Sequence, residues 1–239
     1  MKKLFIIFFF IVSQDFLFAQ QYYPLPDSNA AWIRLDPGCP FPCPVPYRKF
    51  FTSIQKNDTV ISSNTYTKIF CDYNLQPHTS YFGAYRSNTT GKTFFVPIDS
   101  IKEFLLFDFS RNPGDTIKQL LVAYDTLGGR IADYIVDSIG SVTAGPYSLK
   151  TLSLRMIGPP PISCFYEYLT WIEKIGNLGS GVINFDCHGC AIGPVLNCMQ
   201  FNDTIYYESV GCSSIYWFPQ SVTYLQGQCS FPVWKFPPN

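Results

Sequence analysis

Short apolar segments separated by turn residues run through most of the chain after Gln20, and this pattern predicts strands. The clearest example is residues 151–156, where Leu152, Leu154 and Met156 alternate with polar residues. A period of two places the apolar side chains on one face of a sheet. Apolar residues at helical spacing form no convincing stretch, so we expect little helix.

Two neighbouring strands are expected at residues 120–126 and 130–139, joined by Gly128-Gly129. Glycine reaches positive φ without a steric cost, which suits a tight hairpin turn. Further turns are expected at Asn112-Pro113-Gly114-Asp115 and at Gly145-Pro146. The sequence therefore predicts an all-β fold: an antiparallel sheet, strongly curved or closed into a barrel or sandwich.

The N-terminus has the pattern of an export signal. Lys2 and Lys3 precede an unbroken apolar run at residues 4–12, and Leu17 and Ala19 suit positions minus three and minus one of a cleavage site. We expect residues 1–19 to be removed after Ala19, giving a secreted, periplasmic or cell-surface protein. A spanning helix needs roughly 20 apolar residues. Since Asp15 interrupts this run, we expect no membrane span in the mature chain.

Residues 20–239 fit one β-rich domain, with no repeat or second boundary. Residues 37–46 contain five prolines and are expected to form a stiff loop, because proline donates no ladder hydrogen bond. Residues 226–239, rich in proline and aromatic residues, are expected to form an extended arm held by Cys229.

The charge balance names no polyanionic partner. Removing Lys2, Lys3 and Asp15 takes the 17 basic and 17 acidic residues to 15 and 16, a net charge near minus one. Nucleic-acid sites show a basic patch that neutralises phosphates, and here no cluster exceeds Arg48-Lys49. We expect no nucleic-acid partner.

Nine cysteines in an exported chain favour disulfides, because an oxidising compartment lets thiols pair. The odd number leaves one cysteine over, and the pattern does not choose the partners. In the proline-rich loop, Cys39 and Cys43 could pair with each other or tie the loop to the body.

Several segments, taken in order, resemble an uncharacterised family of secreted proteins from bacteria that use the type IX secretion route. They are Tyr81-Phe82-Gly83-Ala84-Tyr85-Arg86, Leu105-Leu106-Phe107-Asp108-Phe109-Ser110 with Gly114-Asp115-Thr116, Thr170-Trp171-Ile172-Glu173-Lys174-Ile175-Gly176, and Leu196-Asn197-Cys198-Met199-Gln200-Phe201 with Thr204-Ile205-Tyr206-Tyr207. The resemblance covers most of residues 20–212. It implies export and a β-fold, and it assigns no activity or catalytic residue. It also makes Cys198 with Cys212 the first-choice disulfide, because these cysteines flank a strand pair in the family pattern.

The chain also departs from that pattern. Lys174 stands where the family has glycine, and residues 187–190 look like an addition. Many members end in a C-terminal sorting domain, whereas this chain stops at Asn239. We therefore do not expect export by the type IX route.

The residue types in Asp186-Cys187-His188-Gly189-Cys190 could bind a metal, because thiolates and imidazoles are zinc ligands. With Cys198 and Cys212, Cys187 and Cys190 could instead form two disulfides, which the compartment favours. A redox-active pair is a third alternative, since a nearby histidine lowers the pKa of a thiol. We assign no metal or cofactor, and Cys187, His188 and Cys190 remain the candidate ligands.

Catalytic patterns are incomplete. A serine triad needs a base, and neither histidine, His78 or His188, has a recognisable context. The segment 176–181 lacks a glycine that a nucleophile elbow requires, so we expect a flexible loop. Glu167 and Glu173 are six residues apart, about 20 Å along a strand at roughly 3.3 Å per residue, too far for a glycosidase pair. We expect Glu173 to be a sheet-edge or turn residue and assign no catalytic residue.

A tripeptide of aspartate, serine or threonine, and an aliphatic residue recurs. It occurs at Asp58-Thr59-Val60, Asp99-Ser100-Ile101, Asp115-Thr116-Ile117, Asp125-Thr126-Leu127, Asp137-Ser138-Ile139 and Asp203-Thr204-Ile205. One interpretation is that aspartate ends a turn and the next residues enter a strand. The other is resemblance to the O-glycosylation motif of exported proteins in the same bacterial group.

The composition of the chain indicates a class of function more clearly than any single motif does. Charged residues make up 14% of the chain and aromatic residues 18%, which favours a non-catalytic extracellular module that binds a glycan or a protein surface. Among the aromatic residues, Tyr216, Trp217 and Trp234 are expected to be exposed. The alternative is a secreted hydrolase or a thiol or metal enzyme with a site near His188.

Overall fold

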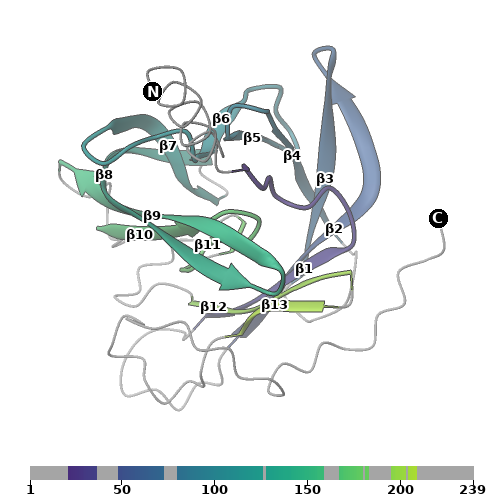
Figure 1. Ribbon diagram of the computed structural model, residues 1–239. Helices are drawn as coiled ribbons and strands as arrows, with labels where there is room; N and C mark the ends of the chain where they lie inside the picture. The colour runs from purple at the N-terminus through teal and green to yellow at the C-terminus, as the bar shows by residue number, and fades with distance from the viewer. Residues whose placement is uncertain are drawn as a thin grey trace, which may run out of the picture.

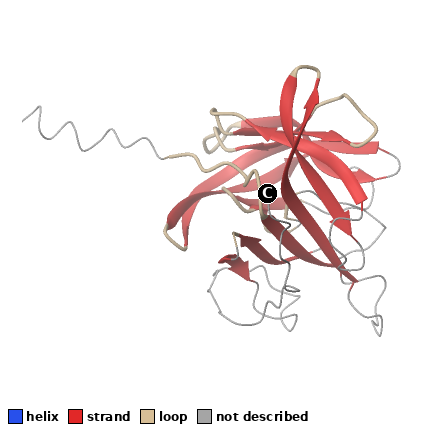
Figure 2. Ribbon diagram, turned by 90° about the vertical axis from the view of Figure 1, so that its right-hand side faces the viewer, coloured by secondary structure: helices blue, strands red, loops and turns tan. Residues whose placement is uncertain are grey.

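The computed structural model describes residues 21–36, 48–72, 80–125, 128–158, 167–179, 181–182, 195–202 and 204–208. Strands, turns and loops make up all of this part, and it contains no helix (Figure 2). A helix long and apolar enough to cross a membrane is therefore absent from these residues.

The described residues contain thirteen strands, numbered in chain order. They are β1 (Ala30–Asp36), β2 (Arg48–Ile61), β3 (Asn64–Asp72), β4 (Ser80–Ser87), β5 (Lys92–Pro97), β6 (Phe104–Asp108), β7 (Thr116–Asp125), β8 (Gly128–Ala144), β9 (Tyr147–Ile157), β10 (Tyr168–Ile172), β11 (Gly176–Asn177), β12 (Val195–Phe201) and β13 (Thr204–Glu208).

All of these strands belong to one sheet, in the order β11-β10-β9-β8-β7-β6-β5-β4-β3-β2-β1-β12-β13. Neighbours are antiparallel except for β6 and β7, which meet in one parallel pair, Leu105 with Leu120. The predicted all-β, mainly antiparallel fold is confirmed. In the part of the chain described, no ladder joins β11 to β13, so hydrogen bonds do not close the sheet into a barrel.

The sheet nevertheless bends back on itself around the larger of its hydrophobic clusters (Figure 1). The ring centroids of Phe107 in β6 and Trp171 in β10 lie 5.2 Å apart, although β7, β8 and β9 stand between these strands in the sheet. In a flat sheet, four strand spacings would separate them by roughly 19 Å. On another side of the core, Trp32 of β1 donates its Nε1–H to the carbonyl of Ile175, after β10, at 2.8 Å.

The predicted alternation in β9 is confirmed, because Leu152, Leu154 and Met156 are buried between less buried neighbours. The predicted hairpin of β7 with β8 is also present. Its turn was misplaced, since Gly128 and Gly129 already pair with Asp125 and Tyr124 as the first residues of β8.

The other predicted turns are confirmed. The amide of Asp115 donates to the carbonyl of Asn112 at 3.0 Å, and the side chain of Asp115 accepts from the amide of Asn112 at 2.9 Å. Gly145 lies between β8 and β9 with φ of 57°, in the left-handed region that favours glycine.

Residues 21–29 form no strand, yet they contribute to the core. In Figure 1 they are the purple trace that crosses the middle of the molecule before β1. Leu25 is buried within the core, and the hydroxyl of Tyr85 donates to the carbonyl of Pro26. Core packing and single hydrogen bonds, including one from the amide of Asn202 to the carbonyl of Asn29 at 3.1 Å, therefore hold this segment against the sheet.

The predicted export signal at residues 1–19, the proline-rich loop at 37–46 and the arm at 226–239 lie outside the described residues. The single-domain organisation of residues 20–239 stays a prediction.

Candidate functional site

Aromatic rings from four consecutive strands gather in what we call the aromatic cluster: Phe82 of β4, Phe95 of β5, Phe104 of β6 and Tyr124 of β7. Phe82 stacks on Phe95 with 5.7 Å between ring centroids. Tyr124 meets Phe82, Phe95 and Phe104 at 6.0, 6.2 and 6.4 Å, with its ring steeply inclined to theirs. Phe95 is buried and the other three are half-buried. Edge-to-face contacts of this kind fix the orientation of each ring.

Phe104 has a glycine on one side and a cation near its ring. A Cβ atom on Gly129 would lie 3.0 Å from the Phe104 ring, so only glycine leaves full room for it. The ammonium of Lys102 lies 4.8 Å from the centroid of the same ring, within the range of a cation–π contact. The cluster thus combines fixed, partly exposed rings with an exposed positive charge.

The loop that carries Lys102 is fastened by Glu103. Arg86 donates from Nε and from its Nη2 to the two carboxylate oxygens of Glu103 at 2.5 and 3.0 Å, and the Tyr66 hydroxyl donates at 2.7 Å. The guanidinium also lies 4.8 Å from the centroid of Phe94. Burial raises the pKa of Glu103, but the hydrogen bonds from Arg86 and Tyr66 and the charge of Arg86 outweigh it, leaving the pKa below its ordinary value. Glu103 is therefore an ionised anchor.

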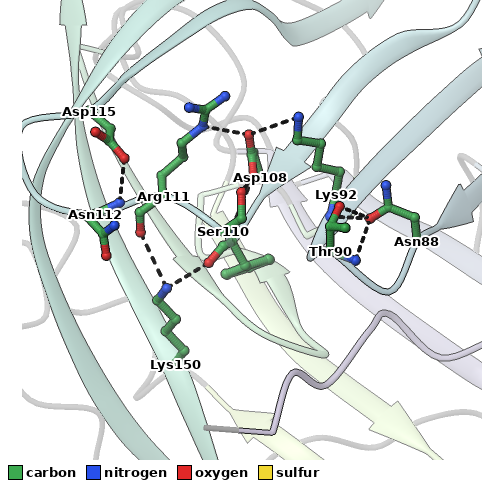
Figure 3. Close-up of polar contacts among 10 residues, drawn as sticks. Asn88, Thr90, Lys92, Asp108, Ser110, Arg111, Asn112, Asp115 and Lys150 are labelled. Atoms are coloured by element: carbon green, nitrogen blue, oxygen red, sulfur yellow. Dashed lines mark hydrogen bonds and ion pairs between the residues drawn. The ribbon is translucent and has the colours of Figure 1, made fainter. Parts of the chain in front are cut away.

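A second polar group surrounds Asp108, the last residue of β6, whose side chain is 0% exposed (Figure 3). Its Oδ1 accepts from the amide and the hydroxyl of Ser110 at 3.2 and 2.5 Å. Its Oδ2 accepts from Nε of Arg111 at 2.7 Å and lies 3.9 Å from Nζ of Lys92. Both oxygens are engaged, so Asp108 holds the loop at residues 109–115 and the two cations in place.

Lys92 is positioned by the turn before β5. The side-chain oxygen of Asn88 accepts from the amide and hydroxyl of Thr90 at 3.1 and 2.8 Å and from the amide of Lys92 at 2.9 Å. Asparagine commonly closes a turn in this way. The backbone that presents the Lys92 side chain is therefore fixed.

Lys150 at the start of β9 joins this group to the turn after β10. Its Nζ donates to the carbonyls of Phe109 and Arg111 at 2.7 and 3.4 Å, and its amide donates to Oε2 of Glu173 at 2.9 Å. Burial raises the pKa of Glu173, against the opposing effects of the Lys150 amide, the Lys150 charge and the Tyr23 amide. Glu173 is a buried turn residue, as the sequence predicts.

Tyr22 from the N-terminal segment reaches the same end of the sheet. It forms hydrogen bonds with Thr93 and Ser87, and its ring centroid lies 6.1 Å from that of Phe109. Burial raises the pKa of Tyr22 above its ordinary value. The hydroxyl is thus a neutral structural contact.

Lys174 stands at a position where the resemblance described above predicts glycine. Its φ is 65°, a conformation that favours glycine. The side chain is buried, with Nζ 3.8 Å from the ring centroid of Tyr147 and 4.5 Å from that of Phe201. Contacts with these two rings offset the cost of the lysine backbone conformation.

Most of the residues singled out by the sequence have no described side chain. This group comprises His78, Cys39, Cys43, Cys187, His188, Cys190, Cys212, Tyr216, Trp217, Cys229 and Trp234, and it includes Cys198, whose backbone lies in β12. Their proposed pairings and metal role stay predictions. Within the described residues there is no group of three or more histidine, cysteine or acidic side chains that could hold a metal ion.

The glutamates and the glycine-rich segment have clear positions. Glu167 precedes β10 and Glu173 follows it, so the two lie at opposite ends of this strand. The flexible loop expected at residues 176–181 is instead a hydrogen-bonded hairpin: Asn177 and Gly181 exchange amide-to-carbonyl bonds at 2.8 and 2.6 Å. A Cβ atom on Gly176 would lie 2.7 Å from the Gly181 carbonyl oxygen, which explains this glycine.

The recurring tripeptides do not share one structural role. Asp115 ends a turn directly before β7, as the turn interpretation predicts. Asp58 and Asp137 instead lie inside β2 and β8, so turn chemistry does not account for them. In each of these two strands the ladder register shifts next to the tripeptide.

Sequence reasoning missed both the aromatic cluster and the Asp108 group. Their members come from several different strands, and each member alone resembles an ordinary core or surface residue. One signal was available, because Phe82, Asp108 and Glu173 lie in segments that carry the family resemblance. The structure gives those segments packing and hydrogen-bonding roles.

Comparisons of the chain with family models, with curated proteins and with solved structures gave no match.

Proposed function

We propose that this protein is an exported, non-catalytic binding module that holds a glycan or a protein surface ligand at the aromatic cluster. The proposal keeps the expected export after Ala19. It adds a location to the binding function that composition favoured, in side chains other than Tyr216, Trp217 and Trp234.

The observation that carries the proposal is the partial exposure and the mutual contact of the Phe104 and Tyr124 rings. Both rings are half-buried, they contact each other at 6.4 Å, and the buried Phe95 packs against Tyr124. Rings fixed by the sheet lose little conformational freedom on binding, so they stack on an apolar or sugar face at low entropic cost. Lys102 adds a donor at the rim of the cluster.

The curvature of the sheet supports a rigid platform for these rings. We further propose that the sheet closes into one barrel-like or sandwich-like body, because β1 and the turn after β10 meet across the core. A ligand would then meet a preformed surface.

Glycan arrays and pull-downs with the mature protein test the function. We expect a retained ligand, and we expect Tyr124→Ala to weaken its binding about ten-fold or more, in line with aromatic hot spots at interfaces. Tyr168→Ala is the matched control, because Tyr168 is an exposed tyrosine on β10. Blank arrays and pull-downs, or equal losses in both variants, would contradict the proposal.

A further inference from the structure

The loop after β6 and the start of β5 present two cations to solvent on either side of a carboxylate that solvent does not reach. Arg111 and Lys92 have side chains that are 36% and 35% exposed, whereas Asp108 is 0% exposed. Both cations approach the same oxygen, Oδ2 of Asp108, within 3.9 Å. They are therefore close enough for a single oxyanion to reach both.

The carboxylate orders Arg111 without exhausting its donors. Asp108 accepts from Nε, and the two terminal nitrogens of Arg111 form no hydrogen bond with the described residues. Figure 3 draws the guanidinium beside Asp108 with no dashed line from those nitrogens. A guanidinium edge with two free N–H groups matches the geometry of sulfate, phosphate and carboxylate.

The surrounding charges also favour an anion. Lys92 and Arg111 share one carboxylate, Asp108, which leaves one positive charge in excess among these three residues, while the charge of Lys150 acts on Glu173. The ammonium of Lys150 donates to the carbonyls of residues 109 and 111, and these hydrogen bonds fix the backbone of the loop after β6. The nearby Asp115 accepts from the amide of Asn112, within its own turn.

Other arginine–carboxylate pairs in the described residues lack this combination. Arg86 spends Nε and Nη2 on Glu103. Arg155 also binds its partner Asp137 through Nε, but both side chains are exposed, at 47% and 37%. An exposed pair is screened by water and holds neither side chain in a fixed orientation.

We infer that Arg111 and Lys92, held by buried Asp108, form a binding site for an oxyanion: a sulfate, phosphate or carboxylate group of a ligand. The site is separate from the aromatic cluster and does not depend on the proposed function. Asp108 is a positioning residue, and the two cations make the contacts.

Titration calorimetry of the mature protein with sodium sulfate, at ionic strength held constant with sodium chloride, tests this inference. We expect saturable binding in the native protein and a loss of affinity of about ten-fold or more in Arg111→Gln, because the variant loses the charged guanidinium that donates to the oxyanion. Lys92→Gln should weaken sulfate binding as well. Arg155→Gln, the control for removing an arginine from an ion pair, should bind sulfate as the native protein does.

Polymer arms distinguish the source of the anion. Dextran sulfate that binds with the same dependence on Arg111 indicates an oxyanion carried by a polysaccharide, whereas sulfate binding without dextran sulfate binding indicates a free anion. Neutral dextran should not bind at this site. The Nε–Hε nuclear magnetic resonance signal of Arg111 should shift with sulfate in the native protein, which covers the case of an Arg111→Gln variant that fails to fold. Absence of saturable sulfate binding, or unchanged affinity in Lys92→Gln and Arg111→Gln, would overturn the inference.

Discussion

Glu173 and Glu103 show how the same side chain takes opposite roles in this protein. Burial dominates at Glu173 and raises its pKa, whereas the hydrogen bonds and charge of its partners prevail at Glu103 and lower its pKa. A carboxyl group with a raised pKa resists ionisation in the folded state, and one with a lowered pKa favours it. The two residues therefore affect stability with opposite dependence on pH.

Glu173→Gln tests the buried carboxyl group. Because the folded pKa of Glu173 is raised above 4.5, its stabilising contribution is present below that value and is lost as the pH rises through the folded pKa. Glutamine keeps an acceptor for the Lys150 amide but does not ionise. We expect the native protein to lose stability relative to Glu173→Gln as the pH rises above 4.5, as measured by urea unfolding. Glu167→Gln, at the exposed end of β10, is the control, and a parallel change in both variants would contradict the assignment.

For single residues, the sequence predicted burial and backbone turns better than it predicted the partners of polar side chains. The buried leucines of β9 and the turn at Asp115 follow from local patterns, and both are confirmed. The carboxylate of Asp108 has no such pattern, because its contact with Lys92 depends on where β5 ends up beside β6. A contact that depends on the register between two strands carries no signal within either strand.

Elements in this fold are joined by contacts across the core as well as by ladders. Trp32→Phe removes the Nε1–H that reaches the Ile175 carbonyl and leaves that buried acceptor without its donor. We expect the free energy of unfolding to fall by about 1–3 kcal/mol from the lost hydrogen bond, in addition to the smaller ring volume. Trp171→Phe makes the same change of ring without removing this bond, so its cost in chemical denaturation should be lower. Equal costs would argue against a link between β1 and the turn after β10.

Glu103 anchors the end of the loop between β5 and β6 through Arg86 and Tyr66. Because the pKa of Glu103 is lowered, its contribution to stability is present above 4.5 and is lost as the pH falls through the folded pKa. Glu103→Gln keeps the loop sequence but loses the ion pair with Arg86. We expect faster hydrogen exchange at the amides of residues 98–102 in this variant at pH 7, with the difference from the native protein shrinking as the pH is lowered. Asp137→Asn, which breaks the exposed pair with Arg155, should leave exchange in that loop unchanged.

The prediction of elements succeeded where periodicity is strong and failed where glycines have tertiary roles. The sequence predicts a turn at Gly128-Gly129. These glycines instead belong to β8, where the missing side chain of Gly129 leaves room for the Phe104 ring of β6. The sequence predicts a flexible loop at the glycine-rich residues 176–181. The structure has a hairpin there, in which Gly176 lies close to Gly181. Turn propensity and close packing both select glycine, and sequence alone does not separate them.

For the whole molecule, the all-β class was predictable and the bend of the sheet was not. Alternation within a strand states which face is buried, but it does not state which other strand covers that face. The contact of Phe107 with Trp171 answers that question for β6 and β10. The aromatic cluster and the Asp108 group follow from the same arrangement, because each collects side chains from several strands.

The N-terminal segment, residues 21–29, also packs against the core of the bent sheet, so it is expected to contribute to the stability of the intact protein. Residues 21–29 form no ladder and are held by packing and single hydrogen bonds: Leu25 lies in the core, Tyr23 meets the Tyr147 ring at 5.2 Å, and the Pro26 carbonyl accepts from Tyr85. We expect Leu25→Ala in the mature chain to lower the free energy of unfolding by about 2–5 kcal/mol, the range for a buried leucine. Pro24→Ala changes an exposed neighbour in the same segment and should have a much smaller effect. If Leu25→Ala unfolds at the same urea concentration as the native protein, the segment is a peripheral strap and the two halves of the bent sheet hold together without it.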